Sequence, residues 1–167
     1  EMDIGLPWKR ESIEKWIKEI IRRNKLLDAR VRVTVTRGQN NYKFTTSKNP
    51  TLTIICERLV PNSKLEQGIS VSTMKLQRLL PEIKSMSLIS MVVAYRRTVT
   101  TGDFEMIFIG SNNKVREGAG SNVFIVKKGV LYTPAREILQ GLTRKRVLEL
   151  AKKLHIPVRI KEMSASA

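Results

Sequence analysis

The chain has 167 residues, which is enough for one ordinary domain or two small ones. No apolar run approaches the roughly 20 residues that a membrane-spanning helix needs. Residues 1–10 lack the apolar core of a secretion signal, and the single cysteine excludes an internal disulfide. These features predict a cytoplasmic protein without a membrane segment.

The charge is strongly positive, with 31 lysines and arginines against 15 acids and a formal net charge of +16. Such an excess makes nucleic-acid binding a rival function. The basic residues are spread along the chain in short clusters, however, and only 5% of all residues are aromatic. We therefore expect a solvated basic surface, and polyanion binding stays open as an alternative of a different class.

The first third of the chain predicts one helix followed by two strands. Apolar residues at helical spacing predict an amphipathic helix over residues 11–24. Strict alternation of valine with polar residues predicts a strand over residues 30–36. A short apolar run predicts a second strand over residues 51–56.

The remaining residues predict several short strands and two further helices. The expected elements are a strand at 68–74, a helix at 84–97, a strand at 104–109, a turn at 110–113, a hairpin of 122–126 with 130–132, and a helix at 143–154. This order predicts a mixed α/β fold and not a doubly wound sheet. One histidine and one cysteine cannot supply a His/Cys metal site, so no metal is expected.

Three stretches in the second half of the chain stand in a set order and spacing. The first is Glu-Ile-Lys-Ser-Met-Ser-Leu at 82–88, and the second is Arg-Glu-Gly-Ala-Gly-Ser-Asn-Val-Phe at 116–124. The third is Leu-Tyr-Thr-Pro at 131–134, followed by Ile-Leu-Gln-Gly-Leu-Thr-Arg at 138–144. Together they resemble the signature of the class IV pyridoxal-phosphate-dependent aminotransferases. That family includes branched-chain and D-amino-acid aminotransferases and aminodeoxychorismate lyase.

By this resemblance, Lys84 is the catalytic residue that forms a Schiff base with the aldehyde of pyridoxal 5'-phosphate. The amine must lose its proton, against an ordinary lysine pKa of about 10.4. Burial and nearby positive charge lower the pKa of a lysine. The same amine would then move the proton between the substrate Cα and the cofactor.

The resemblance also assigns cofactor-binding roles to the second stretch. Glu117 matches the carboxylate that faces the pyridine nitrogen of the cofactor. A carboxylate there keeps the nitrogen protonated and strengthens the electron sink. Ser121 and Asn122 follow it, and we expect them to support the site or its turn.

The third stretch matches the phosphate-binding turn of the family at Gly141, Leu142 and Thr143. Glycine lets the backbone approach a ligand closely, and the amides of Leu142 and Thr143 would open the following helix toward an anion. Threonine is also a common helix N-cap, and the two roles can coexist. Leu139 matches the apolar residue that covers one face of the cofactor ring.

The resemblance implies the class IV aminotransferase fold, with two α/β subdomains and the cofactor at their junction. We expect residues 1–60 to be the C-terminal part of the small subdomain and residues 61–65 to be a linker. Residues 66–167 would then form the larger cofactor-binding subdomain, incomplete at its end. Family members are longer at both ends, so we expect a truncated portion of such a protein. They are usually homodimers.

The implied function is transfer of an amino group between an amino acid and a 2-oxo acid, with the branched-chain type favoured. Residues 39–44 lack the Arg-x-His pair of the D-amino-acid enzymes, which weakens that specificity. Ser87 stands where the family often has asparagine, so the substrate remains open. Aminodeoxychorismate lyase is the runner-up. An inactive, basic polyanion-binding protein on the same fold is the alternative of another class.

Overall fold

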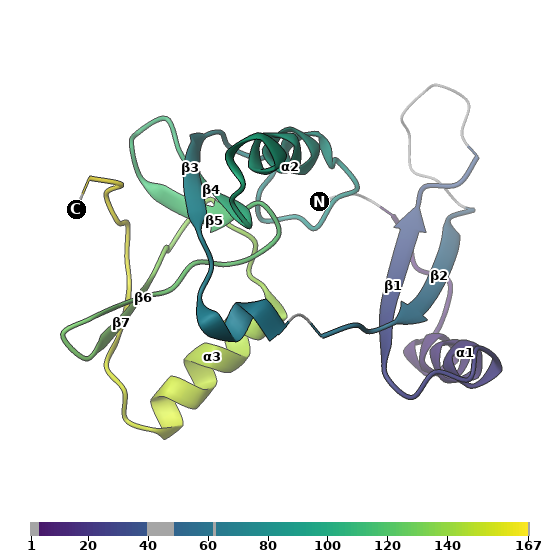
Figure 1. Cartoon of the computed structure of the whole chain (residues 1–167). Helices are drawn as coiled ribbons and strands as arrows, with labels where there is room; N and C mark the ends of the chain where they lie inside the picture. Colours follow the sequence, from purple (N-terminus) through teal and green to yellow (C-terminus); the bar gives the residue numbers. More distant parts are fainter. Residues whose placement is uncertain (1–3, 40–48, 62, 167) are drawn as a thin grey trace. The chain divides into compact units, whose positions relative to one another are not determined.

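The computed structural model describes residues 4–39, 49–61 and 63–166. The chain divides into two compact units, Glu1–Ser63 and Lys64–Ala167, whose helices and strands are labelled in Figure 1. Residues 40–44, which enter the comparison with the D-amino-acid enzymes, lie outside the described residues. Asn62 of the expected linker also lies outside them.

The first unit consists of one helix and a two-stranded sheet. Helix α1 spans Arg10–Arg23, and β1 (Ala29–Thr36) pairs antiparallel with β2 (Thr51–Arg58). This confirms one predicted helix and two predicted strands, with ends that differ by two residues at most.

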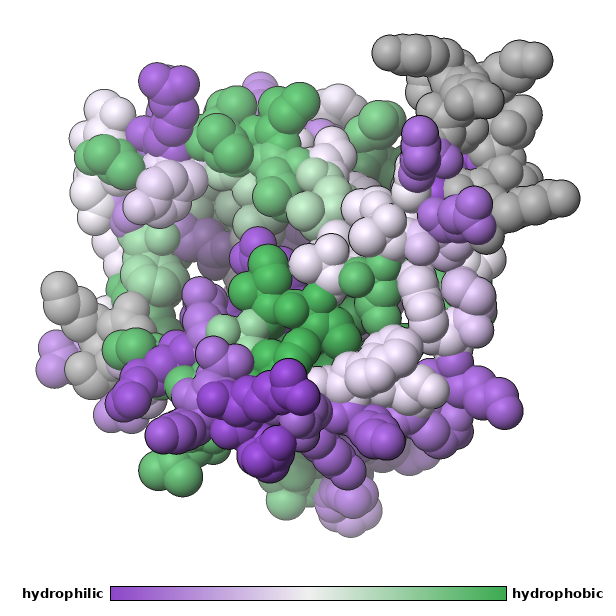
Figure 2. Space-filling model, turned by 90° about the vertical axis from the view of Figure 1, so that its right-hand side faces the viewer, coloured by the Kyte–Doolittle hydropathy of each residue, from purple (hydrophilic) through white to green (hydrophobic). Residues whose placement is uncertain are grey.

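Few side chains of this unit are buried. No residue of α1 is buried, and Val33 in β1 and Ile55 in β2 are 44% and 51% exposed. A two-stranded sheet with one helix cannot enclose a core of its own. The charged side chains of α1 gather at the bottom of the face seen in Figure 2.

The short 3-10 helix η1 (Ser63–Gln67) spans the division between the units, and a βαβ crossover follows it in the second unit. Strand β3 (Val71–Lys75) lies parallel to β4 (Glu105–Ile109), and helix α2 (Ile89–Thr101) connects them. Strand β5 (Val115–Gly118) pairs antiparallel with β4 and completes the order β3-β4-β5.

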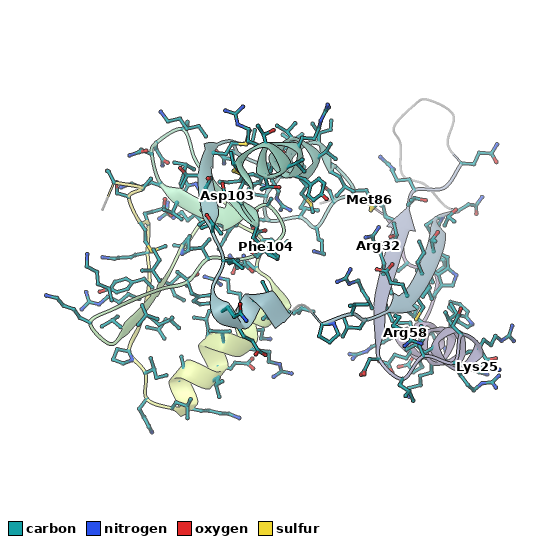
Figure 3. All side chains as sticks on the ribbon, viewed as in Figure 1. Lys25, Arg32, Arg58, Met86, Asp103 and Phe104 are labelled. Carbon is teal, nitrogen blue, oxygen red and sulfur yellow. The ribbon has the colours of Figure 1, made fainter. Side chains whose placement is uncertain are left out.

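The parallel pair is tied together where its strands begin. Asp103 accepts hydrogen bonds from the hydroxyl of Ser70 at 2.6 Å and from that of Ser72, and it lies beside the labelled Phe104 in Figure 3. The Phe104 N–H donates to the Ser70 carbonyl at 2.9 Å. The buried residues that pack α2 on this sheet are Ala94, Met106 and Phe108.

A second sheet has the order β6-β7-β8. Strands β6 (Ile125–Lys127) and β7 (Val130–Thr133) form the predicted hairpin, whose turn at 128–129 has two positive φ angles of 51° and 73°. Helix α3 (Leu142–Lys153) then leads to β8 (Val158–Ile160), which pairs parallel with β7.

The start of one predicted helix is wrong. Residues 84–97 were expected to be helical, but α2 begins at Ile89 and leaves Lys84 in an irregular segment. The Ser85 hydroxyl accepts a hydrogen bond from the Ser87 N–H at 3.3 Å. Such local bonds offer the backbone an alternative to the helix.

Other differences concern short strands. The strand predicted over 122–126 starts later, because β6 begins at Ile125 and the Asn122 side chain bonds a distant backbone carbonyl. Strands β5 and β8 were not predicted. With four and three residues, they are too short to show an alternating pattern.

The two sheets share a small core in which the last residues of the chain take part. The Val115 N–H donates to the Met163 carbonyl at 2.9 Å, which anchors the end of the chain beside β5. The buried members of this cluster are Ile109, Val115 and Met163. Strand β5 is therefore held from both sides, and the candidate site begins on it.

Candidate active site

Glu117 on β5 is the centre of the candidate site. The residue is only 4% exposed, although it carries an ionisable carboxyl. One of its oxygens, Oε2, accepts a hydrogen bond from the backbone N–H of Leu139 at 2.8 Å. The strand thus contacts the segment that leads into α3.

Arg78, which the sequence did not single out, forms an ion pair with the same carboxylate. Its Nε lies 3.0 Å from Glu117 Oε1, and both side chains are largely buried. The Arg78 Nη2 donates to the carbonyls of Pro81 and Ile83, the latter at 3.4 Å. Arg78 therefore connects Glu117 to the backbone of Pro81 and Ile83, just before Lys84 in the sequence.

Lys84 is exposed in the irregular segment between β3 and α2, two residues before the labelled Met86 of Figure 3. Its positive charge acts on Glu117, because it is one of the charges that lower the pKa of that carboxyl. The buried environment expected for the lysine is not provided by the described residues. The amine is nevertheless electrostatically linked to the acid.

Burial dominates the electrostatics of Glu117. It raises the pKa of this carboxyl above the ordinary value, although the Leu139 N–H, Arg78 and Lys84 each lower it. Because burial makes the charged form of this carboxyl costly, a ligand group that donates a proton or a hydrogen bond to it would bind favourably.

This raised pKa gives a prediction for stability. The folded chain holds the Glu117 proton more tightly than the unfolded chain, so Glu117 contributes stability that is complete below the unfolded pKa and is lost as the pH rises through the folded pKa. Relative to a Glu117→Gln variant, the native chain should therefore gain stability as the pH falls from neutrality toward the ordinary glutamate pKa. Urea unfolding of both proteins across this range measures the difference. A difference that stays flat would contradict burial as the dominant influence.

A tight turn from Leu139 to Gly141 lies next to Glu117. The Gly141 N–H donates to the Leu139 carbonyl at 2.9 Å, and the same carbonyl accepts a bond from Asn122 Nδ2 at 2.8 Å. A Cβ at Gly141 would lie 2.3 Å from Asn122 Oδ1, so the turn or the asparagine side chain would have to move. Glycine avoids this contact, whereas its φ of −62° is an angle that other residues adopt freely.

Helix α3 begins immediately after this turn with its N-terminus open. Gly141 is its N-cap and provides no side-chain hydrogen bond, while Leu142 is 84% exposed and Thr143 is also exposed. The first N–H groups of a helix lack partners within the helix and carry partial positive charge. This end of α3 can therefore receive an anion.

Arg144 adds a buried positive charge to the first turn of α3. The residue is 6% exposed, and burial lowers the pKa of its guanidinium. Its neutral partners are Gln140 Oε1 at 2.7 Å, the Pro134 carbonyl at 3.0 Å and Thr133 Oγ1 at 3.4 Å. The Gly-Leu-Thr-Arg motif contains this residue, but no role was expected for it.

Ser121 has a different partner from the other predicted site residues. Its hydroxyl donates to Glu105 Oε2 at 2.7 Å, and the Gly120 N–H donates to Oε1 of the same side chain at 2.7 Å. Ser121 thus closes the turn after β5 on Glu105. Hydrogen bonds join Glu117, Asn122, Leu139 and Gly141 to one another. Lys84 is not bonded to this group, although its charge acts on Glu117, and Ser121 is bonded to Glu105 instead.

The sequence of the chain is similar to that of known aminotransferases. The profile of the family described as Amino-transferase class IV matches residues 2–167. A Methanocaldococcus jannaschii protein named as a branched-chain-amino-acid aminotransferase is 35% identical over 163 residues, which cover 93% of this chain and 57% of that protein. A D-alanine aminotransferase of Listeria monocytogenes is 27% identical over 95% of this chain and 58% of its own length.

Solved structures show the same fold. The branched-chain aminotransferase of the archaeon Thermoproteus uzoniensis, solved with norvaline, superposes with a TM-score of 0.87 at 25% identity. The match covers 98% of this chain and 58% of that one. A structure from Legionella pneumophila named as a 4-amino-4-deoxychorismate lyase gives a TM-score of 0.89 at 16% identity, over 97% of this chain and 62% of that one.

The fold is therefore the mixed α/β fold of the class IV aminotransferases, as predicted. The chain belongs to the class IV aminotransferase family. It spans a little over half the length of the curated relatives that it matches. Within the described residues, no helix has the length and apolar character needed to cross a lipid bilayer.

Proposed function

We propose that the chain is the cofactor-binding portion of a pyridoxal-phosphate-dependent aminotransferase. The protein would move an amino group between an amino acid, of branched-chain type, and a 2-oxo acid. The observation that carries this proposal is Glu117, a buried carboxylate that bonds the Leu139 amide beside a glycine-capped helix N-terminus. The name of the Methanocaldococcus jannaschii relative supports the branched-chain type.

The residues present fit pyridoxal phosphate. Glu117 is a buried carboxylate that Arg78 and the Leu139 N–H hold in place, so it suits the protonated nitrogen of a ring. The open amides of Leu142 and Thr143, with the charge of Arg144 beneath them, suit a phosphate group. Leu139 is half-buried on the turn between them, where its side chain can cover a ring.

Each residue then has a defined task. Bound pyridoxal phosphate would supply an electron sink for the bond at the substrate Cα. Lys84 would hold the cofactor covalently and move the Cα proton, while Glu117 holds the proton of the ring nitrogen. Asn122 positions the turn through the Leu139 carbonyl, and Ser121 supports β5 through Glu105.

The remaining expectations are proposals that accompany this function. Residues 1–60 would belong to the small subdomain, 61–65 to the linker and 66–167 to the larger subdomain; a division between Ser63 and Lys64 is compatible with this. We further propose a homodimer located in the cytoplasm. The net charge of +16 would serve solubility and attraction of anionic substrates, not nucleic-acid binding.

The proposal is tested by trapping the cofactor on the protein. After incubation with pyridoxal phosphate and reduction with borohydride, peptide mass analysis should find the pyridoxyl group on Lys84. The same protein should convert leucine and 2-oxoglutarate to the corresponding oxo acid and glutamate. A label scattered over the lysines, or no label, would reject the proposal.

Two parallel assays separate the alternatives. Release of pyruvate from aminodeoxychorismate without amino transfer would favour the lyase, for which the Legionella pneumophila structure is a precedent of fold. Nucleic-acid affinity that falls steeply with salt, combined with no cofactor uptake, would favour the polyanion-binding alternative.

A further inference from the structure

Arg116, the neighbour of Glu117 on β5, is the most deeply buried charged residue outside the proposed cofactor contacts among the described residues. It is 3% exposed. Its Nη1 lies 2.6 Å from Glu162 Oε2, and its Nη2 pairs with Glu137 and donates to Asn112 Oδ1 at 3.1 Å. Side chains of adjacent strand residues point to opposite faces, so Arg116 contacts the protein on the side away from Glu117.

One guanidinium here has two carboxylate partners from separate segments. Glu162 follows β8, whereas Glu137 lies between β7 and α3. A buried guanidinium needs a single negative charge for neutrality. The need to neutralise Arg116 therefore accounts for one of its two ion pairs. The second ion pair calls for a different explanation.

The backbone of Glu137 points to that role. Its φ is +56°, a left-handed conformation that is unfavourable for a residue with a side chain. The next residue, Ile138, is 1% exposed, and the one after it donates the Leu139 N–H to Glu117. The left-handed residue is thus the bend that sends Ile138 into the core and turns the Leu139 amide toward the carboxylate.

We propose that Arg116 and Glu137 form a positioning pair that holds the Leu139–Gly141 turn in the conformation that receives the cofactor. Two adjacent residues of β5 bind the segment 137–139, which leads into this turn. Arg116 pairs with the side chain of Glu137, and Glu117 accepts a hydrogen bond from the amide of Leu139. The inference rests on the proposed function, because it assigns that turn to the cofactor. Glu162 is the partner that neutralises Arg116 and fastens the end of the chain.

The two carboxylates provide matched variants. Glu137→Ala and Glu162→Ala each remove one ion pair from Arg116, and alanine keeps the left-handed strain at position 137. Both variants should lose thermal stability to a similar degree. Only Glu137→Ala should raise the Kd for pyridoxal phosphate, by about tenfold. Glu162→Ala should leave this Kd within about twofold of the native value.

A second readout needs no cofactor. Hydrogen exchange at the Leu139 amide should be about tenfold faster in the Glu137→Ala chain and unchanged in the Glu162→Ala chain. If Glu137→Ala fails to fold, Glu137→Gln keeps the size of the side chain, removes its charge, and should show the same direction in both readouts. If substitutions at Glu137 and at Glu162 changed the Kd for pyridoxal phosphate and the exchange of the Leu139 amide equally, the positioning role would be overturned.

The exchange measurement also separates the two proposals. If the native chain binds no pyridoxal phosphate, the proposed function fails, yet Leu139 exchange still decides whether Arg116 and Glu137 position the turn. If the native chain carries the cofactor on Lys84 and both variants keep full affinity, the positioning pair fails and the proposed function stands.

Discussion

Replacing Lys84 with alanine is expected to lower kcat for amino transfer by at least about 10⁴-fold, because the proposed function makes one amine both the covalent anchor and the proton carrier. The Lys84→Arg variant should be equally inactive. Arginine keeps the positive charge that acts on Glu117 but stays protonated and cannot take up a proton. The two variants together separate the chemistry of the amine from its charge.

The measurement is the half-reaction with leucine, followed through the cofactor absorbance. Lys75→Ala, which removes an exposed lysine from β3, is the matched control and should keep full activity. Added methylamine should restore part of the rate to Lys84→Ala, since a free amine can carry the proton, but not to Lys84→Arg, where the longer side chain fills the space. Turnover by Lys84→Ala without an added amine would reject the catalytic assignment.

Local sequence patterns predicted much of the fold because several elements are specified by nearby residues. The hairpin of β6 and β7 follows from its two-residue turn ending in Gly129, and α3 follows from helical spacing and the glycine before it. The predicted helix over residues 84–97 rested on Ile89, Val92 and Val93, which all lie within α2, so the sequence pattern did not locate the start of the helix. The competing hydrogen bond between Ser85 and Ser87 left no pattern that could be recognised.

The residues that join the candidate site could not be predicted in the same way. Arg78 lies 39 positions before Glu117, and nothing in the sequence distinguishes it from the other 30 basic residues. Arg116 and Glu162 are separated by 46 positions. Such pairs depend on how the strands are arranged, and no local spacing encodes that arrangement. The resemblance proposed Glu117 and Gly141 as candidate site residues, but the contacts that hold them appear only in the folded chain.

Glu117 combines influences that oppose each other. Burial raises the pKa of its carboxyl, because a charged group is costly to keep away from water. The hydrogen bond from the Leu139 N–H and the ion pair with Arg78 each lower that pKa and offset part of the cost. Under the proposed function, this carboxylate would face the protonated ring nitrogen of the cofactor.

Replacing Gly141 with alanine is expected to raise the Kd for pyridoxal phosphate on the order of 100-fold, because a displacement of about 1 Å in a binding group can have effects of that size. The added Cβ would lie 2.3 Å from Asn122 Oδ1, so the turn or the asparagine must move. Backbone strain does not contribute, since φ at Gly141 is −62°, an angle that alanine adopts freely. Titration of the variant with pyridoxal phosphate measures the loss.

A double-mutant cycle tests whether the contact between the new Cβ and Asn122 causes the loss of affinity. Asn122→Ala alone removes the hydrogen bond to the Leu139 carbonyl and should weaken binding by about tenfold. Combined with Gly141→Ala, it also removes the atom that the new Cβ meets, so the double variant should bind about as well as Asn122→Ala alone. If the two losses simply added, the collision would not explain the effect, and the glycine would be needed for the approach of the phosphate itself.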